Sequence, residues 1–168
     1  MIRYLFLLLC AFLAPPLTAQ QSAEFPRQNS FVIHLTSSQF ASGYGEYLVP
    51  VLLKAFKRTG MAHAKTIKAD YALTIEPGMD VGKWYERDGE SVWLYRRTIT
   101  IGLTPAEQDV EPEGRLAPGF AVTTVLLTPN ADRDDEFKCL VSLTTRELAA
   151  RYRPNGHVHV DGTGCARE

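Results

Sequence analysis

The segment 81–103 constrains the fold most, because it has the pattern of one long β-hairpin. Apolar and polar residues alternate on both sides of Asp88-Gly89, and an Asp-Gly pair between alternating runs is the strongest short hairpin signal. A turn at Asp88-Gly89 makes two cross-strand pairs: Trp84 lies opposite Trp93, and Tyr85 lies opposite Val92. Such cross-strand pairs stabilise antiparallel sheets, so we expect antiparallel pairing in this domain.

The rest of the chain divides into short periodic segments. Period-two alternation or β-branched composition predicts strands at residues 31–36, 69–76, 120–128 and 157–160. Apolar residues at helical spacing predict a first helix from Tyr47 to just before Gly60, unless the chain bends at Pro50, and a second helix that starts at Asp134 or Asp135. Pro77, Gly78 and Gly82 are predicted bulges or bends.

This order of elements predicts an α+β fold. The simplest arrangement is a mainly antiparallel sheet of four to five strands with two helices packed on one face. The segment 120–128 is β-branched and uninterrupted, which favours a central strand. The acidic, proline-containing segment 104–119 is predicted to be a solvated loop; its carboxylates offer at most a loose calcium site.

The first nineteen residues have the features of a signal peptide. A basic residue, Arg3, precedes an uncharged apolar run that is too short to span a membrane, and Ala19 stands at the expected cleavage position. A lipoprotein signal is the alternative, but Cys10 lies inside the apolar run and follows Leu9, where a small residue is required. We therefore expect a periplasmic or secreted protein with no transmembrane segment in the mature chain.

The remaining chain is expected to be one domain. Residues 20–29 are polar and aperiodic, which predicts a flexible N-terminal segment, and residues 30–168 form the single α+β domain. Two cysteines stay after cleavage, Cys139 and Cys165. An even pair in an exported chain predicts a disulfide, which would stabilise the fold by roughly 3.5 kcal/mol on the chain-entropy model.

The charge balance excludes one class of partner. Without Arg3 the chain has 17 basic and 19 acidic residues, a net charge of −2, which does not suit a phosphate backbone, so no nucleic-acid partner is expected.

The first half of the domain resembles a family of bacterial envelope proteins. A strand, a helix ending in Lys57-Arg58-Thr59-Gly60, and the strand segment 69–75 are similar to those of small periplasmic α/β lipoproteins, namely the lipopolysaccharide-assembly lipoprotein and the transport-auxiliary lipoproteins. The resemblance covers residues 31–76. It implies a non-enzymatic accessory or assembly role, although this chain has no acylated cysteine at its expected mature N-terminus.

Two groups of residues are candidate sites. His157, His159 and Asp161 share one face of a predicted strand and form a usable ligand set for zinc or copper; alternatively they are the solvent side of an edge strand. The hairpin brings together aromatic and basic side chains typical of interfaces, unless its tryptophans complete the core. These residues are Trp84, Tyr85, Trp93, Tyr95 and Arg97.

Catalytic motifs are missing from the sequence. No Gly-x-Ser-x-Gly elbow, His-Glu-x-x-His helix or phosphate-binding glycine loop occurs. We therefore expect a non-catalytic accessory or binding protein of the cell envelope, without a cofactor and with a protein partner. A metal-binding protein and an enzyme of another type are the alternatives, and the oligomeric state is left open.

Overall fold

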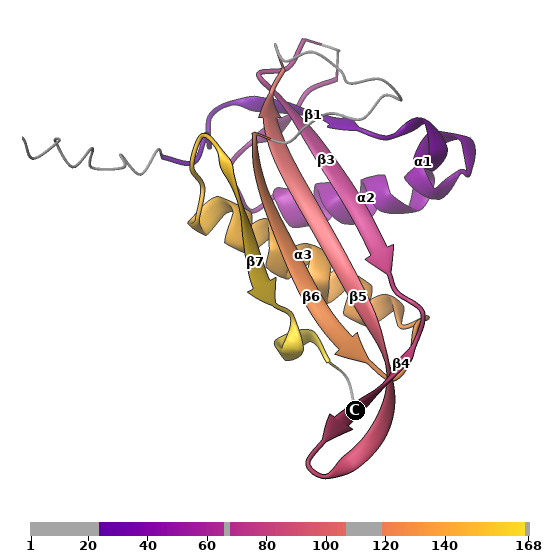
Figure 1. Cartoon of the computed structure of the whole chain (residues 1–168). Coiled ribbons are helices and arrows are strands. Elements are labelled where there is room, and N and C mark those ends of the chain that lie inside the picture. The colour runs from indigo at the N-terminus through magenta and orange to yellow at the C-terminus, as the bar shows by residue number, and fades with distance from the viewer. Residues whose placement is uncertain (1–23, 66–67, 107–118, 167–168) are drawn as a thin grey trace, which may run out of the picture.

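A computed structural model of the chain describes residues 24–65, 68–106 and 119–166 (Figure 1). The expected signal peptide, and residues 107–118 of the predicted acidic loop, lie outside the described residues. The described strands form one seven-stranded sheet: β1 (Ser30–His34), β2 (Ala62–His63), β3 (Tyr71–Met79), β4 (Lys83–Arg87), β5 (Glu90–Pro105), β6 (Phe120–Thr128) and β7 (Gly156–Asp161). The helices are α1 (Ser37–Ala41), α2 (Tyr44–Phe56), α3 (Asp134–Ala150) and a 3₁₀ turn, η2 (Thr163–Cys165).

The sheet is mixed, which corrects the prediction of a mainly antiparallel sheet of four to five strands. Its order is β2-β1-β3-β5-β6-β7, with β4 paired to β5. β1 pairs with β2 and β3 in parallel, and β6 pairs with β7 in parallel, whereas β5 is antiparallel to β3, β4 and β6. The parallel pairs arise because α2 connects β1 to β3 and α3 connects β6 to β7; a helical crossover returns the chain to the end of the sheet where it started.

The α+β class and the two long helices on one sheet face are confirmed (Figure 1). The helices run parallel to each other, since Tyr47 near the start of α2 packs against Phe137 near the start of α3, with ring centroids 5.3 Å apart. β6 lies between β5 and β7, so the predicted central position of segment 120–128 is also confirmed. None of the helices among the described residues is long and apolar enough to cross a membrane.

Several local predictions change in the structure. The helix predicted from Tyr47 begins at Tyr44, so Pro50 lies inside α2, where its side chain is exposed. Pro77 and Gly78 are not a bulge: they pair in regular register with β5. β1 pairs with β3 only up to Thr74. Pro77 therefore lies where one edge of β3 is unpaired with β1, and an edge is the position in a sheet that tolerates proline.

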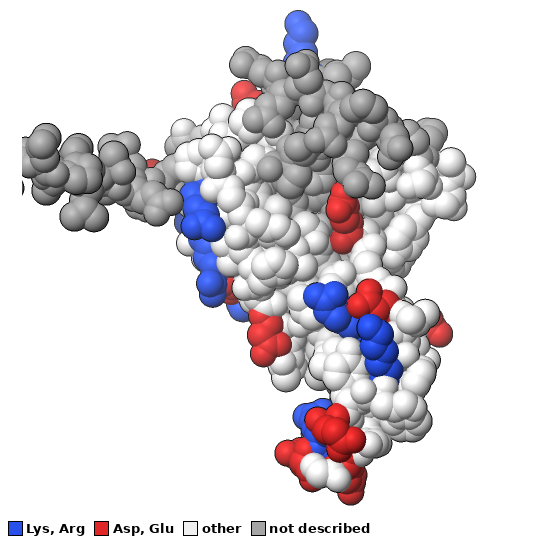
Figure 2. All heavy atoms as spheres, viewed as in Figure 1, with Lys and Arg blue, Asp and Glu red and all other residues white. Residues whose placement is uncertain are grey.

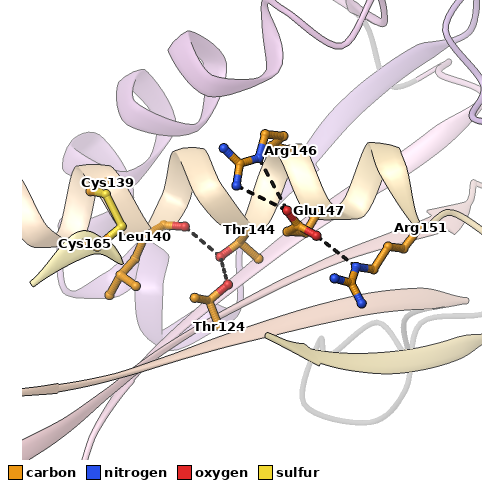
Figure 3. Close-up of polar contacts among 8 residues, drawn as sticks. All are labelled: Thr124, Cys139, Leu140, Thr144, Arg146, Glu147, Arg151 and Cys165. Atoms are coloured by element: carbon orange, nitrogen blue, oxygen red, sulfur yellow. Dashed lines mark hydrogen bonds and ion pairs between the residues drawn. A yellow bond between two sulfur atoms is a disulfide. The ribbon is translucent and has the colours of Figure 1, made fainter. Parts of the chain in front are cut away.

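The core lies between the sheet and the two long helices. Its fully buried apolar side chains come from the central strands and from one face of each helix: Phe31, Leu48, Leu52, Phe56, Leu73, Ile75, Ile99, Ile101, Leu103, Phe120, Val122, Leu126, Leu140, Val141 and Leu148. One polar pair is also buried there. The hydroxyls of Thr124 and Thr144 are hydrogen bonded at 2.7 Å, and Thr144 also donates to the carbonyl oxygen of Leu140 (Figure 3), which satisfies both groups without water.

The predicted disulfide joins Cys139 on α3 to Cys165 on η2, with Cα atoms 5.6 Å apart (Figure 3). It fastens the end of the chain beyond β7 to the helix layer. Part of the predicted flexible segment 20–29, from residue 24 on, is described and lies against the domain. Phe25 is only 5% exposed and packs edge-on against Tyr152, so the packed domain begins before residue 30.

Candidate functional site

The hairpin of β4 and β5 projects beyond the end of the sheet (Figure 1). From Arg97 to Leu103 β5 is paired on both sides, with β3 and with β6. From Glu90 to Leu94 it pairs only with β4. The outer part of the hairpin therefore has no strand beside it and receives its stability from its own turn and cross-strand contacts.

The turn at the tip has the geometry that the sequence predicts. Asp88 and Gly89 both have positive φ, 53° and 83°, as a type I′ turn requires. The predicted register is confirmed, with Trp84 opposite Trp93 and Tyr85 opposite Val92. The two indoles meet edge to face, with ring centroids 5.4 Å apart, an arrangement that aromatic rings prefer.

Gly82 makes room for this tryptophan pair. A Cβ atom on Gly82 would lie 2.2 Å from Nε1 of Trp93 and 2.5 Å from its Cε2. The indole of Trp93 is thus seated directly over the backbone at the entrance to β4. Gly82 is a predicted bulge or bend; its close contact with an aromatic ring gives the residue a second reason to be glycine.

Large hydrophobic side chains are exposed at this end of the molecule. In the hairpin, Trp84 is 67% exposed and Trp93 41%, and Val81, just before β4, is 81% exposed. The other exposed large hydrophobics of the described residues lie at the hairpin base, on the ends of β3 and β6 and at the start of α2: Met79, Leu127, Tyr44 and Tyr47. All of them lie at one end of the molecule, although Leu127 points away from the helix layer that carries Tyr44 and Tyr47, and we call this set the hairpin patch. Clustered apolar exposure of this kind marks interaction sites.

Charged residues occupy the tip. The tip carries three acidic residues, Glu86, Asp88 and Glu90, and one basic residue, Arg87. All four are exposed. Figure 2 shows acidic and basic atoms close together at the end of the hairpin, whereas the visible sheet face above it is mostly uncharged. These charges keep the tip hydrated and discourage the free edge of β4 from pairing with another strand.

Arg97 belongs to the base of the hairpin and not to its surface. Its register suggested a place in the exposed patch, but it is 7% exposed. Its guanidinium donates to the carbonyl oxygen of Arg133 at 2.6 Å and to that of Ala131. The side chain therefore fixes the segment before α3 to β5 and offers no contact to a partner.

The start of α2 is fastened to the same base. The Tyr47 hydroxyl donates to the carboxylate of Asp134, which also accepts from Lys138. Burial, followed by the hydrogen bond to Asp134, raises the pKa of Tyr47, and the hydrogen bond from Lys138 contributes most to lowering the pKa of Asp134. The phenol stays protonated and the carboxylate ionised, so the contact persists at neutral pH.

The second predicted site does not assemble as a ligand set. His157, His159 and Asp161 lie on the outer face of β7 while Val158 and Val160 turn toward the core. The imidazoles stack with centroids 4.7 Å apart, and Nε2 of His157 is hydrogen bonded to the Thr123 hydroxyl at 2.7 Å. Asp161 accepts from the backbone and the hydroxyl of Thr163.

Among the described residues, no group of three or more His, Cys, Asp or Glu side chains could hold a metal ion. Burial, and then the charge of His159, lower the pKa of His157. The histidine pair is thus a hydrogen-bonded surface feature of the last strand.

Sequence reasoning found the tryptophan pair but missed part of the hairpin patch. Tyr85 and Tyr95 are half-buried, so they contribute less surface than predicted. Val81, Met79 and Leu127 contribute more. Their exposure depends on where β3 and β6 end relative to the hairpin, and an isolated apolar residue near a strand end gives no signal of this in the sequence.

Comparison with known proteins finds a structural likeness but no sequence match. No family model matches the chain, and no curated protein sequence matches it. One similar solved structure is a minor lipoprotein from Acinetobacter baumannii, with 12% sequence identity and a TM-score of 0.43, covering 72% of this chain and 92% of that one. The likeness carries no functional conclusion, and the family resemblance in residues 31–76 stays a resemblance.

Proposed function

We propose that this chain is an exported, non-catalytic accessory protein of the cell envelope that docks onto a protein partner through the hairpin patch. The observation that carries the proposal is the exposure of Trp84 and Trp93 on a hairpin that projects from an otherwise well-packed domain. Export is supported by the apolar N-terminal segment and by the disulfide between Cys139 and Cys165, since disulfides persist in oxidising compartments.

The chemistry of the hairpin favours a protein over a membrane surface. Tryptophan anchors with a polar rim are typical of binding hot spots in protein interfaces. The hairpin also ends in three acidic residues against one basic residue, and this excess of negative charge would be repelled by an anionic bilayer. We therefore expect the indoles to enter an apolar pocket of a partner, with the charged tip at the rim.

The direct test is photo-crosslinking in the native cell. A benzophenone-bearing amino acid replaces Trp84, and a matched variant carries it at Arg151, which is also more than half exposed. Arg151 follows the last turn of α3, about 25 Å along that helix from the end that lies near the hairpin base. Circular dichroism of both purified variants verifies that they fold alike.

We expect one discrete protein adduct from position 84 and none of the same mass from position 151. Equal adducts at both positions would indicate nonspecific contact and overturn the proposal. Adducts to lipid alone, or no adduct at position 84 in the cell that naturally makes the chain, would overturn it as well.

A further inference from the structure

A second surface, separate from the hairpin patch, lies in a groove between α2 and α3. The groove has a volume of about 830 Å³. On α3, the side that faces the sheet carries Thr144, which contacts Thr124 of β6. Arg146 projects from the other side of the helix and lines the groove (Figure 3). Ligand pockets typically enclose about 300–1,000 Å³, so the groove has the size of a small-molecule site.

The groove is strongly basic. Five of its sixteen lining residues are cationic, and none is acidic: Arg27, Lys54, Arg58, Lys138 and Arg146. The whole chain has 18 basic and 19 acidic residues out of 168, so an average surface of sixteen residues would carry both signs about equally. The concentration of positive charge is therefore a property of this site and not of the composition.

Three of these cations are available to a ligand. Lys138 forms an exposed ion pair of low strength with Asp134. Arg146 pairs at 3.3 Å with Glu147, whose mostly buried carboxylate also binds Arg151. Within the described parts of the chain, no carboxylate pairs with Arg27, Lys54 or Arg58. Cationic groups around a concave, low-dielectric surface focus their field into it, which attracts anions.

The floor of the groove is apolar. Aliphatic side chains from both helices line it, together with the disulfide: Val51, Ala55, Leu143, Ala149 and Cys139–Cys165. Two buried threonines, Thr59 and Thr145, also line the groove, and their hydroxyls donate to the carbonyl oxygens of Phe56 and Val141. The small side chains keep the floor concave, and the disulfide holds its η2 wall against α3. A basic rim around an apolar floor complements a molecule with one anionic and one apolar end.

We infer that the α2–α3 groove binds a single-chain anionic lipid, with its phosphate headgroup at the cationic rim and its acyl chain along the apolar floor. A protein segment is the alternative occupant, and the competition experiment below separates it from a lipid. The site is independent of the hairpin, so binding here neither requires nor excludes a protein partner there.

The test titrates the chain from residue 20 onward with 1-oleoyl-lysophosphatidylglycerol, below its micellar concentration, by isothermal titration calorimetry. Two probes separate the parts of the ligand. Oleoyl-lysophosphatidylcholine has the same chain with a zwitterionic headgroup, and glycerol 3-phosphate has the anion without the chain. We expect saturable one-to-one binding of the first lipid, at least tenfold weaker binding of the second, and no measurable binding of the third.

A pair of charge-reversal variants locates the site. Lys54→Glu with Arg58→Glu changes the rim of the groove, and Lys83→Glu with Arg87→Glu makes the same charge change on exposed positions of β4. The groove variant should lose affinity at least tenfold, while the hairpin variant keeps the wild-type affinity. The wild-type affinity should also fall severalfold between 50 and 500 mM salt, a readout that needs no variant.

Other outcomes overturn the inference. Equal binding of the anionic and zwitterionic lipids, or an equal loss in both variants, would show that the groove charges do not select the ligand. Binding of glycerol 3-phosphate as tight as that of the lipid would reduce the site to an anion site. Displacement of the lipid by an acidic amphipathic peptide at lower concentration would identify a protein segment as the better occupant.

Discussion

Strand β5 passes through two environments that differ in neighbours, exposure and composition. Its inner part, from Ile99 to Leu103, lies between β3 and β6 beneath the helices, and its core-facing side chains are fully buried. Its outer part, from Glu90 to Leu94, pairs with β4 alone among the described strands and carries an exposed tryptophan. One continuous strand is thus a structural element at one end and, under the proposed function, a recognition element at the other.

This difference suggests a division of labour. The inner part supplies buried apolar area, about 25 cal/mol per Å² removed from water, and rigidly supports the outer part. The outer part adds little to the stability of the domain, so its residues are free to be chosen for binding. Both tryptophans of the chain lie in the hairpin, Trp93 in the outer part of β5 and Trp84 opposite it in β4. Fluorescence therefore reports on the hairpin, while circular dichroism reports mainly on the sheet and helices.

The largest effect should come from truncating the inner part. Ile101 is fully buried between the sheet and the helices, and Ile101→Ala should lower the free energy of unfolding by about 2–5 kcal/mol because it leaves a cavity. The matched change Trp84→Ala, on an exposed ring, should stay within about 1 kcal/mol of wild type. Urea unfolding followed by circular dichroism measures both. Comparable losses in the two variants would contradict the division.

The next effect should come from the disulfide. Replacing Cys139 and Cys165 together by serine opens a loop whose ends are 26 residues apart and should cost about 3.5 kcal/mol on the chain-entropy model. Because this link lies in the helix layer, we expect the emission maximum of the folded variant to match wild type. A shifted emission maximum in the folded state would show that the hairpin depends on this distant link.

A smaller effect should appear at the boundary between the two parts. Arg97→Met leaves the carbonyl oxygens of Ala131 and Arg133 without their donor and should cost about 1–3 kcal/mol. The matched control is Arg96→Met, one residue away, whose guanidinium makes an exposed ion pair with Asp80 at 3.5 Å. That control should cost less than about 1 kcal/mol. Equal costs for both variants would mean that Arg97 is not a structural anchor.

The elements near this boundary also show what sequence could predict. The Asp88-Gly89 turn and the Trp84–Trp93 register follow from local rules, namely the positive φ that a type I′ turn needs and the period of two along a strand. The buried state of Arg97 does not follow from such rules. It depends on two carbonyl groups more than thirty residues away in sequence, and only the tertiary structure brings them together.

The parallel strand pairs were missed for a different reason. The two-residue strand β2 (Ala62–His63) was not predicted. The other strands were, but alternation in a single strand carries no information about the direction of its neighbour. The helices between β1 and β3 and between β6 and β7 do carry that information, since a crossover helix returns the chain for parallel pairing. The α2–α3 groove was beyond sequence reasoning, because its cations come from separate segments.

The smallest effect is the pH dependence of the free energy of unfolding that comes from His157, and the hairpin should not change with it. Burial and the neighbouring His159 lower the pKa of His157 in the folded chain, whereas the unfolded chain should titrate near 6.5. The unfolded state therefore binds the proton more readily, and the contribution of His157 to stability is fully present above about pH 6.5 and is lost as the pH falls through the lowered pKa of the folded state. His157→Asn should reduce the loss of stability between pH 7.5 and 5.5, as measured by urea unfolding at each pH.

All four histidines lie outside residues 81–103, so the tryptophan emission of the folded protein should not change over this pH range. A pH-dependent shift of the emission would show that the two parts of β5 are coupled through the sheet.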